Sequence, residues 1–148
     1  MTDTEDDVRA IRALFTRQFA ALSWRDGEAG DWDAFAADFL PGAPLYSSAR
    51  PAAALTVEAF LTRMRGLAGG VLRSLDEMVL GAEIRVFGNI AVATVACGMT
   101  ENGKPGSDTV EMLLLVKDGA AGWRIAAQAW DKASATNPVP AGLLERRQ

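Results

Sequence analysis

The sequence predicts an α+β fold in which three N-terminal helices cover a curled, mainly antiparallel sheet. Two observations predict this class. Residues 5–67 carry apolar side chains at spacings of three and four, which is typical of amphipathic helices. From residue 72 the pattern changes to apolar runs of strand length, separated by short turns that contain Gly or Asn. Short turns join antiparallel neighbours, and helices segregated from an antiparallel sheet define the α+β class.

Three segments are predicted to be helical. The first covers residues 5–24, and Gly27, just after it, suits a left-handed C-terminal cap. The second begins after Asp31 and stops at the Pro-Gly pair at 41–42. The third begins near Thr56 and ends at the two glycines at 69–70. Asp31 and Thr56 are preferred residues for the N-cap, because their side chains accept hydrogen bonds from the first backbone amides.

Four strands follow, at residues 72–87, 90–100, 110–116 and 123–130. Gly81 interrupts the first strand and is a candidate bulge, and Gly88 begins a tight turn into the second. The last two strands flank a Gly-containing turn and form a predicted hairpin. Neither of them alternates cleanly between apolar and polar residues, so we expect both faces of this hairpin to be covered. A short extended piece at 45–47 is expected to add a fifth strand.

The length of 148 residues is near the usual size of one domain, which we place at residues 1–132. Residues 133–148 contain Pro138 and Pro140 and are expected to be a C-terminal tail, either an irregular strap across the domain or disordered.

Composition excludes several partners and compartments. The net charge of −4 argues against nucleic acid and anionic membranes, because both require a basic surface. No apolar stretch is long enough to span a bilayer, and the acidic N-terminus does not read as a secretory signal. The single cysteine, Cys97, lies in an apolar run and is expected to be a small buried hydrophobe. We therefore predict a cytoplasmic protein with a reduced cysteine.

The chain has no histidine, which removes Ser/His and Cys/His nucleophile pairs and imidazole metal sites. We predict no metal site and no organic cofactor. Any acid–base chemistry must then come from Asp, Glu, Lys, Tyr or water.

Three stretches carry a resemblance to a known family. They are the segment GDWDAF at 30–35 with DFLP at 38–41, the segment GNIAVA at 88–93, and the segment GWRIAAQ at 122–128. In order and spacing they resemble the nuclear transport factor 2-like superfamily, which includes SnoaL-like polyketide cyclases, ketosteroid isomerases and scytalone dehydratases. The resemblance covers roughly residues 5–131. Because this chain has no histidine, it cannot have the His–Asp dyad of scytalone dehydratase-like members.

The resemblance implies a cystatin-like cone, or half barrel, with a pocket between the concave face of the sheet and the helices. It implies a hydrophobic small molecule in that pocket and a homodimer through the outer face of the sheet. The tail or a crossing helix could cover that outer face instead. The superfamily contains enzymes and non-enzymes, so the activity stays open. An enzyme would be an isomerase, cyclase or lyase-like dehydratase without metal or cofactor, and the alternative is a non-catalytic ligand-binding or dimerisation module.

Asp131 and Glu111 are the candidate general bases. Asp131 ends an apolar strand and could lie at a pocket rim, where carboxylates can have raised pKa values, or it could be a solvated strand end. Glu111 lies inside a strand, where an isolated buried charge is costly, so it should face an opening or pair with Arg85 or Arg124.

Further residues are candidates for contact with the ligand. Tyr46 or Gln128 could orient a ligand oxygen, and bulky or adaptable side chains suit a planar organic molecule. Each of them could equally be ordinary core, a rim aromatic or a structural hydrogen-bond partner. Strict alternation along residues 123–131 would put Ile125 and Asp131 on one face and Gln128 and Trp130 on the other. The predicted ligand-binding residues are Trp24, Trp32, Phe35, Tyr46, Met78, Met99, Met112, Gln128 and Trp130.

Overall fold

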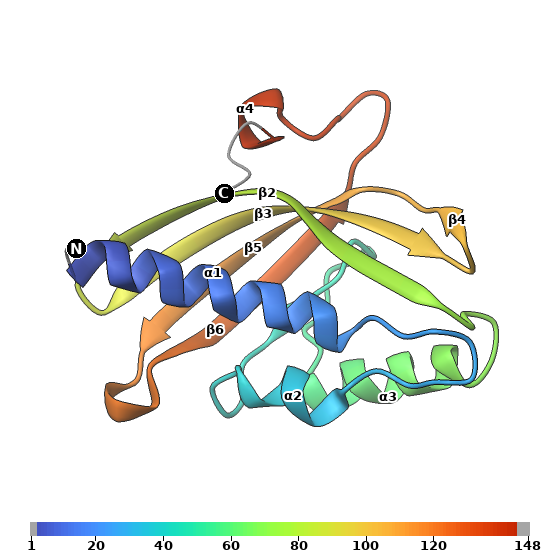
Figure 1. Ribbon diagram of the computed structural model, residues 1–148, viewed down its shortest axis with the longest axis horizontal. Coiled ribbons are helices and arrows are strands. Elements are labelled where there is room, and N and C mark those ends of the chain that lie inside the picture. Colours follow the sequence, from blue (N-terminus) through green and yellow to red (C-terminus); the bar gives the residue numbers. More distant parts are fainter. Residues whose placement is uncertain (1–2, 145–148) are drawn as a thin grey trace.

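The computed structural model describes residues 3–144 and places a curved sheet at the centre of the molecule, with helices on both of its faces (Figure 1). The elements before the central strands are α1 (Asp3–Ala21), α2 (Trp32–Ala37), β1 (Leu45–Tyr46) and α3 (Val57–Ala68). The remaining elements are β2 (Leu75–Phe87), β3 (Ile90–Glu101), β4 (Lys104–Pro105), β5 (Thr109–Lys117), the 3₁₀ helix η1 (Gly119–Ala121), β6 (Trp123–Lys132) and α4 (Ala141–Leu144).

The sheet has the strand order β1-β6-β5-β3-β2, with the short β4 paired to β3. All of its pairs are antiparallel except β1 with β6, where Leu45 lies opposite Gln128. The predicted α+β class and the four long strands are confirmed. The piece at 45–47 does join the sheet, as a two-residue parallel edge strand.

The helices lie where the predicted fold requires them. In Figure 1, α1 crosses one face of the sheet, α2 and α3 lie on that same side, and α4 lies on the opposite side. Asp31 and Thr56 cap α2 and α3, accepting hydrogen bonds from backbone amides three residues later. The first helix ends three residues earlier than predicted. Trp24 leaves the helix because its backbone forms a bridge with Leu75 of β2.

Two ion pairs fix α1 against the rest of the fold. Near its start, Asp7 accepts hydrogen bonds from Lys117 Nζ and Trp123 Nε1, both at 3.0 Å. These two donors keep the pKa of Asp7 below its usual value. Near its end, Arg17 donates to both carboxylate oxygens of Asp38, at 2.9 and 3.1 Å. The bidentate geometry restrains rotation of the helix about its axis.

A bulge in β2 brings the C-terminal segment onto the sheet. The register shifts between Val79 and Gly81, as the glycine predicted. A Cβ atom on Gly81 would lie 2.2 Å from the carbonyl oxygen of Leu143, so only glycine allows this approach. Leu143 is buried, and α4 therefore packs on the outer face of β2 and β3. Residues 133–140 are irregular, and positions 145–148 of the predicted tail lie outside the described residues.

A second register shift, in β6, corrects the predicted facing of its residues. Leu114 pairs with Ala127 and Leu115 pairs with Ile125, so Ala126 is the extra residue. The bulge reverses the alternation that follows it. Gln128 therefore faces inward with Ile125, and Asp131 faces the outside. Strict alternation, which placed Asp131 with Ile125, was wrong for this reason.

The two faces of the sheet differ sharply in burial. The inner face carries the main core, which includes Val95, Leu113, Leu115 and Ile125. The outer face also carries apolar side chains, but these are exposed in the single chain, and α4 covers only the part next to Gly81. None of the helices within residues 3–144 is long and apolar enough to cross a membrane. The exposed outer residues are Met78, Phe87, Ile90, Val92, Met112 and Leu114.

The close contact between Gly81 and Leu143 predicts that one added methyl group at position 81 lowers the stability of the fold. Gly81→Ala should lower the free energy of unfolding by about 1–3 kcal/mol, because the new Cβ forces α4 away from the sheet. Gly66→Ala is the control, since Gly66 lies inside α3 with open space around it and should gain about 0.5–1 kcal/mol. Urea unfolding measures both, and equal stability of Gly81→Ala and the wild type would contradict the packing of α4.

Candidate functional site

A cavity of about 440 Å³ lies between α3 and the inner face of the sheet. Its apolar wall draws on residues far apart in the sequence, because helices and strands both contribute to it. The exposed side chains Arg63, Glu101 and Lys132 also contact this space and mark its open side. The main apolar lining residues are Phe35, Leu45, Phe60, Met64, Met99 and Trp130.

Three aromatic rings make one continuous wall of the cavity. Phe35 and Phe60 are stacked, with ring centroids 5.4 Å apart and an interplanar angle of 27°. Phe60 and Trp130 meet edge to face, with centroids 5.5 Å apart. Such pairs hold one another in place and expose flat ring surface. A planar, largely apolar molecule suits this wall.

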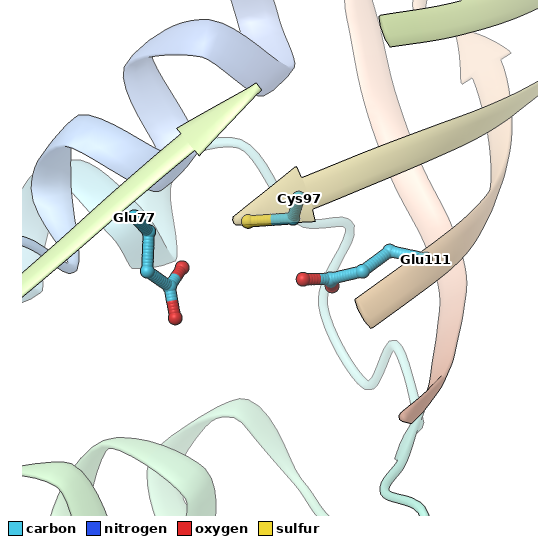
Figure 2. A group of neighbouring side chains, drawn as sticks. All are labelled: Glu77, Cys97 and Glu111. Carbon is cyan, nitrogen blue, oxygen red and sulfur yellow. The ribbon is translucent and has the colours of Figure 1, made fainter. Parts of the chain in front are cut away.

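Two carboxyl groups lie on the polar side of the cavity, and a buried thiol lies next to them. Glu77, Cys97 and Glu111 come from the neighbouring strands β2, β3 and β5, and their side chains point into the same space (Figure 2). One ligand atom of each lies within 4.8 Å of the others. The strand register explains the cluster. Glu77 lies opposite Met99, and Cys97 lies opposite Thr109, so all of these residues share the inner face.

Burial controls the acidity of the two carboxyl groups. It raises the pKa of Glu111 to about 7, although a hydrogen bond from Gln128 acts in the opposite direction. It also raises the pKa of Glu77 well above its usual value, and the negative charges of Glu111 and Glu101 raise it further. Glu77 is half-buried as a residue, but its Oε2 is enclosed and has no hydrogen-bond partner among residues 3–144. Two carboxylates this close cannot both ionise cheaply, so the pair retains one proton near neutral pH.

A chain of amide hydrogen bonds holds Glu111 in position. Gln128 Nε2 donates to Glu111 Oε1 at 2.5 Å, and Gln18 Nε2 donates to Gln128 Oε1 at 2.8 Å. Gln18 is completely buried on α1, and the ion pairs of that helix fix where its amide lies. Among residues 3–144, Glu111 thus pairs with an amide and not with a cation. Of the arginines expected as its partners, Arg85 bonds to Glu83 and Arg124 bonds to the carbonyl of Ala37.

The structure brings together five of the predicted site residues. The cavity is lined by Glu111, Gln128 and Trp130 of the last two long strands, together with Phe35 of α2 and Met99 of β3. Their roles in binding or catalysis stay predictions.

Other predicted residues lie away from the cavity. Asp131 is exposed on the outer face because of the β6 bulge, and its carboxylate accepts from the backbone amide of Lys132. Met78 and Met112 also face outward and are 45% and 61% exposed. Tyr46 is exposed on the edge strand β1. We assign none of these four a place at the site.

Trp24 and Trp32 form a structural pair next to the bridge that ends α1. Their rings meet edge to face with centroids 5.7 Å apart, and Trp24 Nε1 donates to the carbonyl of Leu72. Neither indole lines the cavity. Both rings instead pack between α1, α2 and β2.

Two polar residues of the site, Glu77 and Gln18, are not among the predicted site residues, although the sequence pattern marks each of them. Glu77 alternates with Leu75 and Val79, which places it on the apolar face of its strand. Gln18 follows Leu14 by four positions and Ile11 by seven, which places an amide on the apolar stripe of α1. A polar residue at a core position is more informative than an exposed apolar residue, because a buried polar group must find a hydrogen-bond partner.

The raised pKa of Glu111 predicts a specific pH dependence of stability. The folded state favours the protonated carboxyl, so this stabilisation is present below the unfolded pKa of 4.5 and is lost as pH rises through about 7. Relative to Glu111→Gln, the wild type should lose about 3 kcal/mol of unfolding free energy between pH 4.5 and 8. Urea unfolding in buffer with EDTA measures this difference, and Asp131→Asn is the exposed control. A difference that does not change with pH would contradict the burial of Glu111.

Comparison with known proteins supports the architecture. No protein-family model and no curated protein sequence matches the chain. An NTF2-like protein with a cystatin-like fold from Novosphingobium aromaticivorans matches with a TM-score of 0.73 and 17% identity, over 98% of this chain and 91% of that one. An NTF2-like protein from Pseudomonas putida matches with a TM-score of 0.68 and 14% identity, over 95% and 96% of the two chains. The yeast UBP3-associated protein BRE5 matches with a TM-score of 0.61 and 13% identity, over 90% and 99%. The chain therefore has the cystatin-like α+β fold of the nuclear transport factor 2-like proteins, as the sequence resemblance predicted.

Proposed function

We propose that this protein binds a planar, largely apolar small molecule in its cavity and transfers protons on it without an organic cofactor. The reaction class is isomerisation, cyclisation or dehydration. One observation carries the proposal: two neighbouring carboxyl groups, the buried Glu111 and the half-buried Glu77, line a cavity that also has an aromatic wall. The apolar wall supports binding, and the pair supplies both a proton acceptor and a proton donor.

The roles of the two carboxyl groups follow from their contacts. Glu111 is held by Gln128 and is the candidate base, which removes a proton from a carbon next to a ligand carbonyl. Glu77 has an unpartnered oxygen and is the candidate acid, which donates to the carbonyl oxygen as charge develops there. Return of the proton from Glu111 to a different carbon would complete an isomerisation with no net gain or loss of atoms. Gln128 orients the base, since its amide hydrogen is already committed to Glu111.

Exchange of carbon-bound hydrogen tests this proposal directly. A bicyclic aromatic ketone such as 2-tetralone, incubated in D₂O with EDTA, should exchange the hydrogens next to its carbonyl faster with protein than without. NMR measures the exchange, and Glu111→Gln should slow the protein-dependent rate by about 10²–10⁴-fold, the usual effect of a positioned base. Quenching of tryptophan fluorescence should show that this variant still binds the ketone, because Trp130 lies in the cavity wall.

The matched control for this experiment is Asp131→Asn, which removes a carboxylate from the outer face and should leave exchange unchanged. If the wild type binds the ketone but exchange stays at the buffer rate, the enzyme proposal fails for this substrate class. The alternative of a non-catalytic binding module would then be favoured. The likeness to BRE5, which is described as associated with another protein, fits that alternative at the level of fold.

We also propose that a second copy of this chain covers the outer face of the sheet. The support is the exposed apolar surface on β2, β3 and β5, where Phe87 is 84% and Ile90 is 54% exposed. Exposed apolar patches on this scale are typical of interaction surfaces. We propose a cytoplasmic location as well. The acidic composition and the free, buried Cys97 support it.

The dimer proposal predicts a change of mass on substitution. The wild type should have twice the chain mass by light scattering coupled to size exclusion, and the double variant Val92→Lys, Met112→Glu should have the mass of one chain. Ligand binding should persist, because both positions face away from the cavity. Val71→Glu is the control, since Val71 is 78% exposed but lies outside the sheet. A wild type of single-chain mass at about 100 μM, far above the concentration at which a stable interface dissociates, would contradict the dimer.

A further inference from the structure

The cluster of Glu77, Cys97 and Glu111 contains a thiol that has no part in the proposed proton transfer. The absence of histidine removes imidazole ligands, and the sequence on this ground predicts no metal site. Thiolate and carboxylate groups are themselves metal ligands, however. Three adjacent strands direct one thiol and two carboxyl groups toward the same space (Figure 2). The only cysteine of the chain is part of this set.

The environment of the cluster lacks one contact that a cation would provide. Glu77 Oε2 is enclosed and has no hydrogen-bond partner among the described residues, which is costly for a carboxyl oxygen. Glu111 and Cys97 are both buried, with 8% and 0% of their surface exposed. The Cys97 thiol makes a weak contact, at 3.7 Å, with the backbone carbonyl of Gly98. Burial and the charges of Glu77 and Glu111 raise the pKa of this thiol, so a bound cation must displace its proton. At least one oxygen of the cluster, Glu77 Oε2, therefore has an open coordination capacity.

We infer that Glu77, Cys97 and Glu111 bind a divalent transition-metal cation of the Zn²⁺ or Co²⁺ type. The thiolate favours these cations over Mg²⁺ and Ca²⁺, which prefer sets of six or more oxygens. Ligand atoms on a tetrahedral zinc lie about 3.4–3.6 Å apart, given the usual bond lengths. The three donors lie within 4.8 Å of one another, and a rotation of the Glu77 side chain, whose Oε2 no hydrogen bond restrains, closes the remaining gap.

The hydrogen bonds from Gln18 to Gln128 and from Gln128 to Glu111 are also compatible with metal binding. Ligating carboxylates in metal sites accept hydrogen bonds from neighbouring groups, which fix their orientation. Gln128 donates to Glu111 in this way and is itself held by Gln18. Three protein ligands leave a fourth position, as in zinc sites that bind water or a substrate oxygen. The cavity is the space that this fourth position adjoins, because Glu77 and Glu111 both line it.

This inference goes beyond the proposed function, because proton and cation are alternative partners for the same carboxylates. Its test needs neither substrate nor turnover. The protein is stripped with EDTA, desalted and titrated with CoCl₂ while the near-ultraviolet absorption is recorded. We expect one equivalent of Co²⁺ to produce a thiolate-to-cobalt charge-transfer band, which only Cys97 can supply. Addition of ZnCl₂ should abolish the band by displacement.

Four variants decide between this site and adventitious binding. Cys97→Ser and Cys97→Ala should both lose the band, and circular dichroism shows whether each is folded. Glu77→Gln and Glu111→Gln should weaken Co²⁺ binding by about tenfold or more. Asp76→Asn is the matched control, because Asp76 precedes Glu77 on β2 but is exposed, and it should bind as the wild type does. Co²⁺ binding without a thiolate band, or equal affinity in Glu77→Gln and Asp76→Asn, would overturn the inference.

Discussion

The buried carboxyl group of Glu111 is the constraint on which the site depends. A charge cannot be taken out of water without a partner, so the fold must supply hydrogen bonds or change the protonation state. Here it does both, through Gln128 and through a raised pKa. Gln128 in turn needs a partner, which Gln18 of the first helix provides. The polar interior is therefore one connected network, and the position of α1 decides whether the carboxyl group is held in place.

This network links parts of the chain that are far apart in sequence. Gln18 and Gln128 are separated by 110 positions, yet they exchange hydrogen bonds across the core. Asp7 and Arg17 hold α1 from both ends, through Lys117 and Asp38. Substitutions in α1 would consequently act on the site as well as on stability. The two properties share the same contacts.

Much of the fold could be predicted from the sequence, because it depends on local patterns. The caps at Asp31 and Thr56, the bulge at Gly81 and the four long strands all follow from short-range signals. The site was harder to predict, since it depends on register between strands. Glu111 and Gln128 could be chosen because they interrupt apolar strands. Asp131 could not be excluded without the bulge at Ala126, which no glycine marks. Glu77 gains its importance only from Glu111 and Cys97, which lie on other strands.

The extra residue in β6 has a consequence for how such a cavity can change during evolution. A strand presents its side chains with a period of two, so one inserted or deleted residue exchanges everything beyond that point between the two faces. Loss of Ala126 would turn Gln128 and Trp130 toward the outside and bring Ala129 and Asp131 to the interior. The contents of the cavity would be replaced in a single step, without any substitution. Strand length, as much as residue identity, is thus a variable by which proteins of this architecture can acquire new ligands.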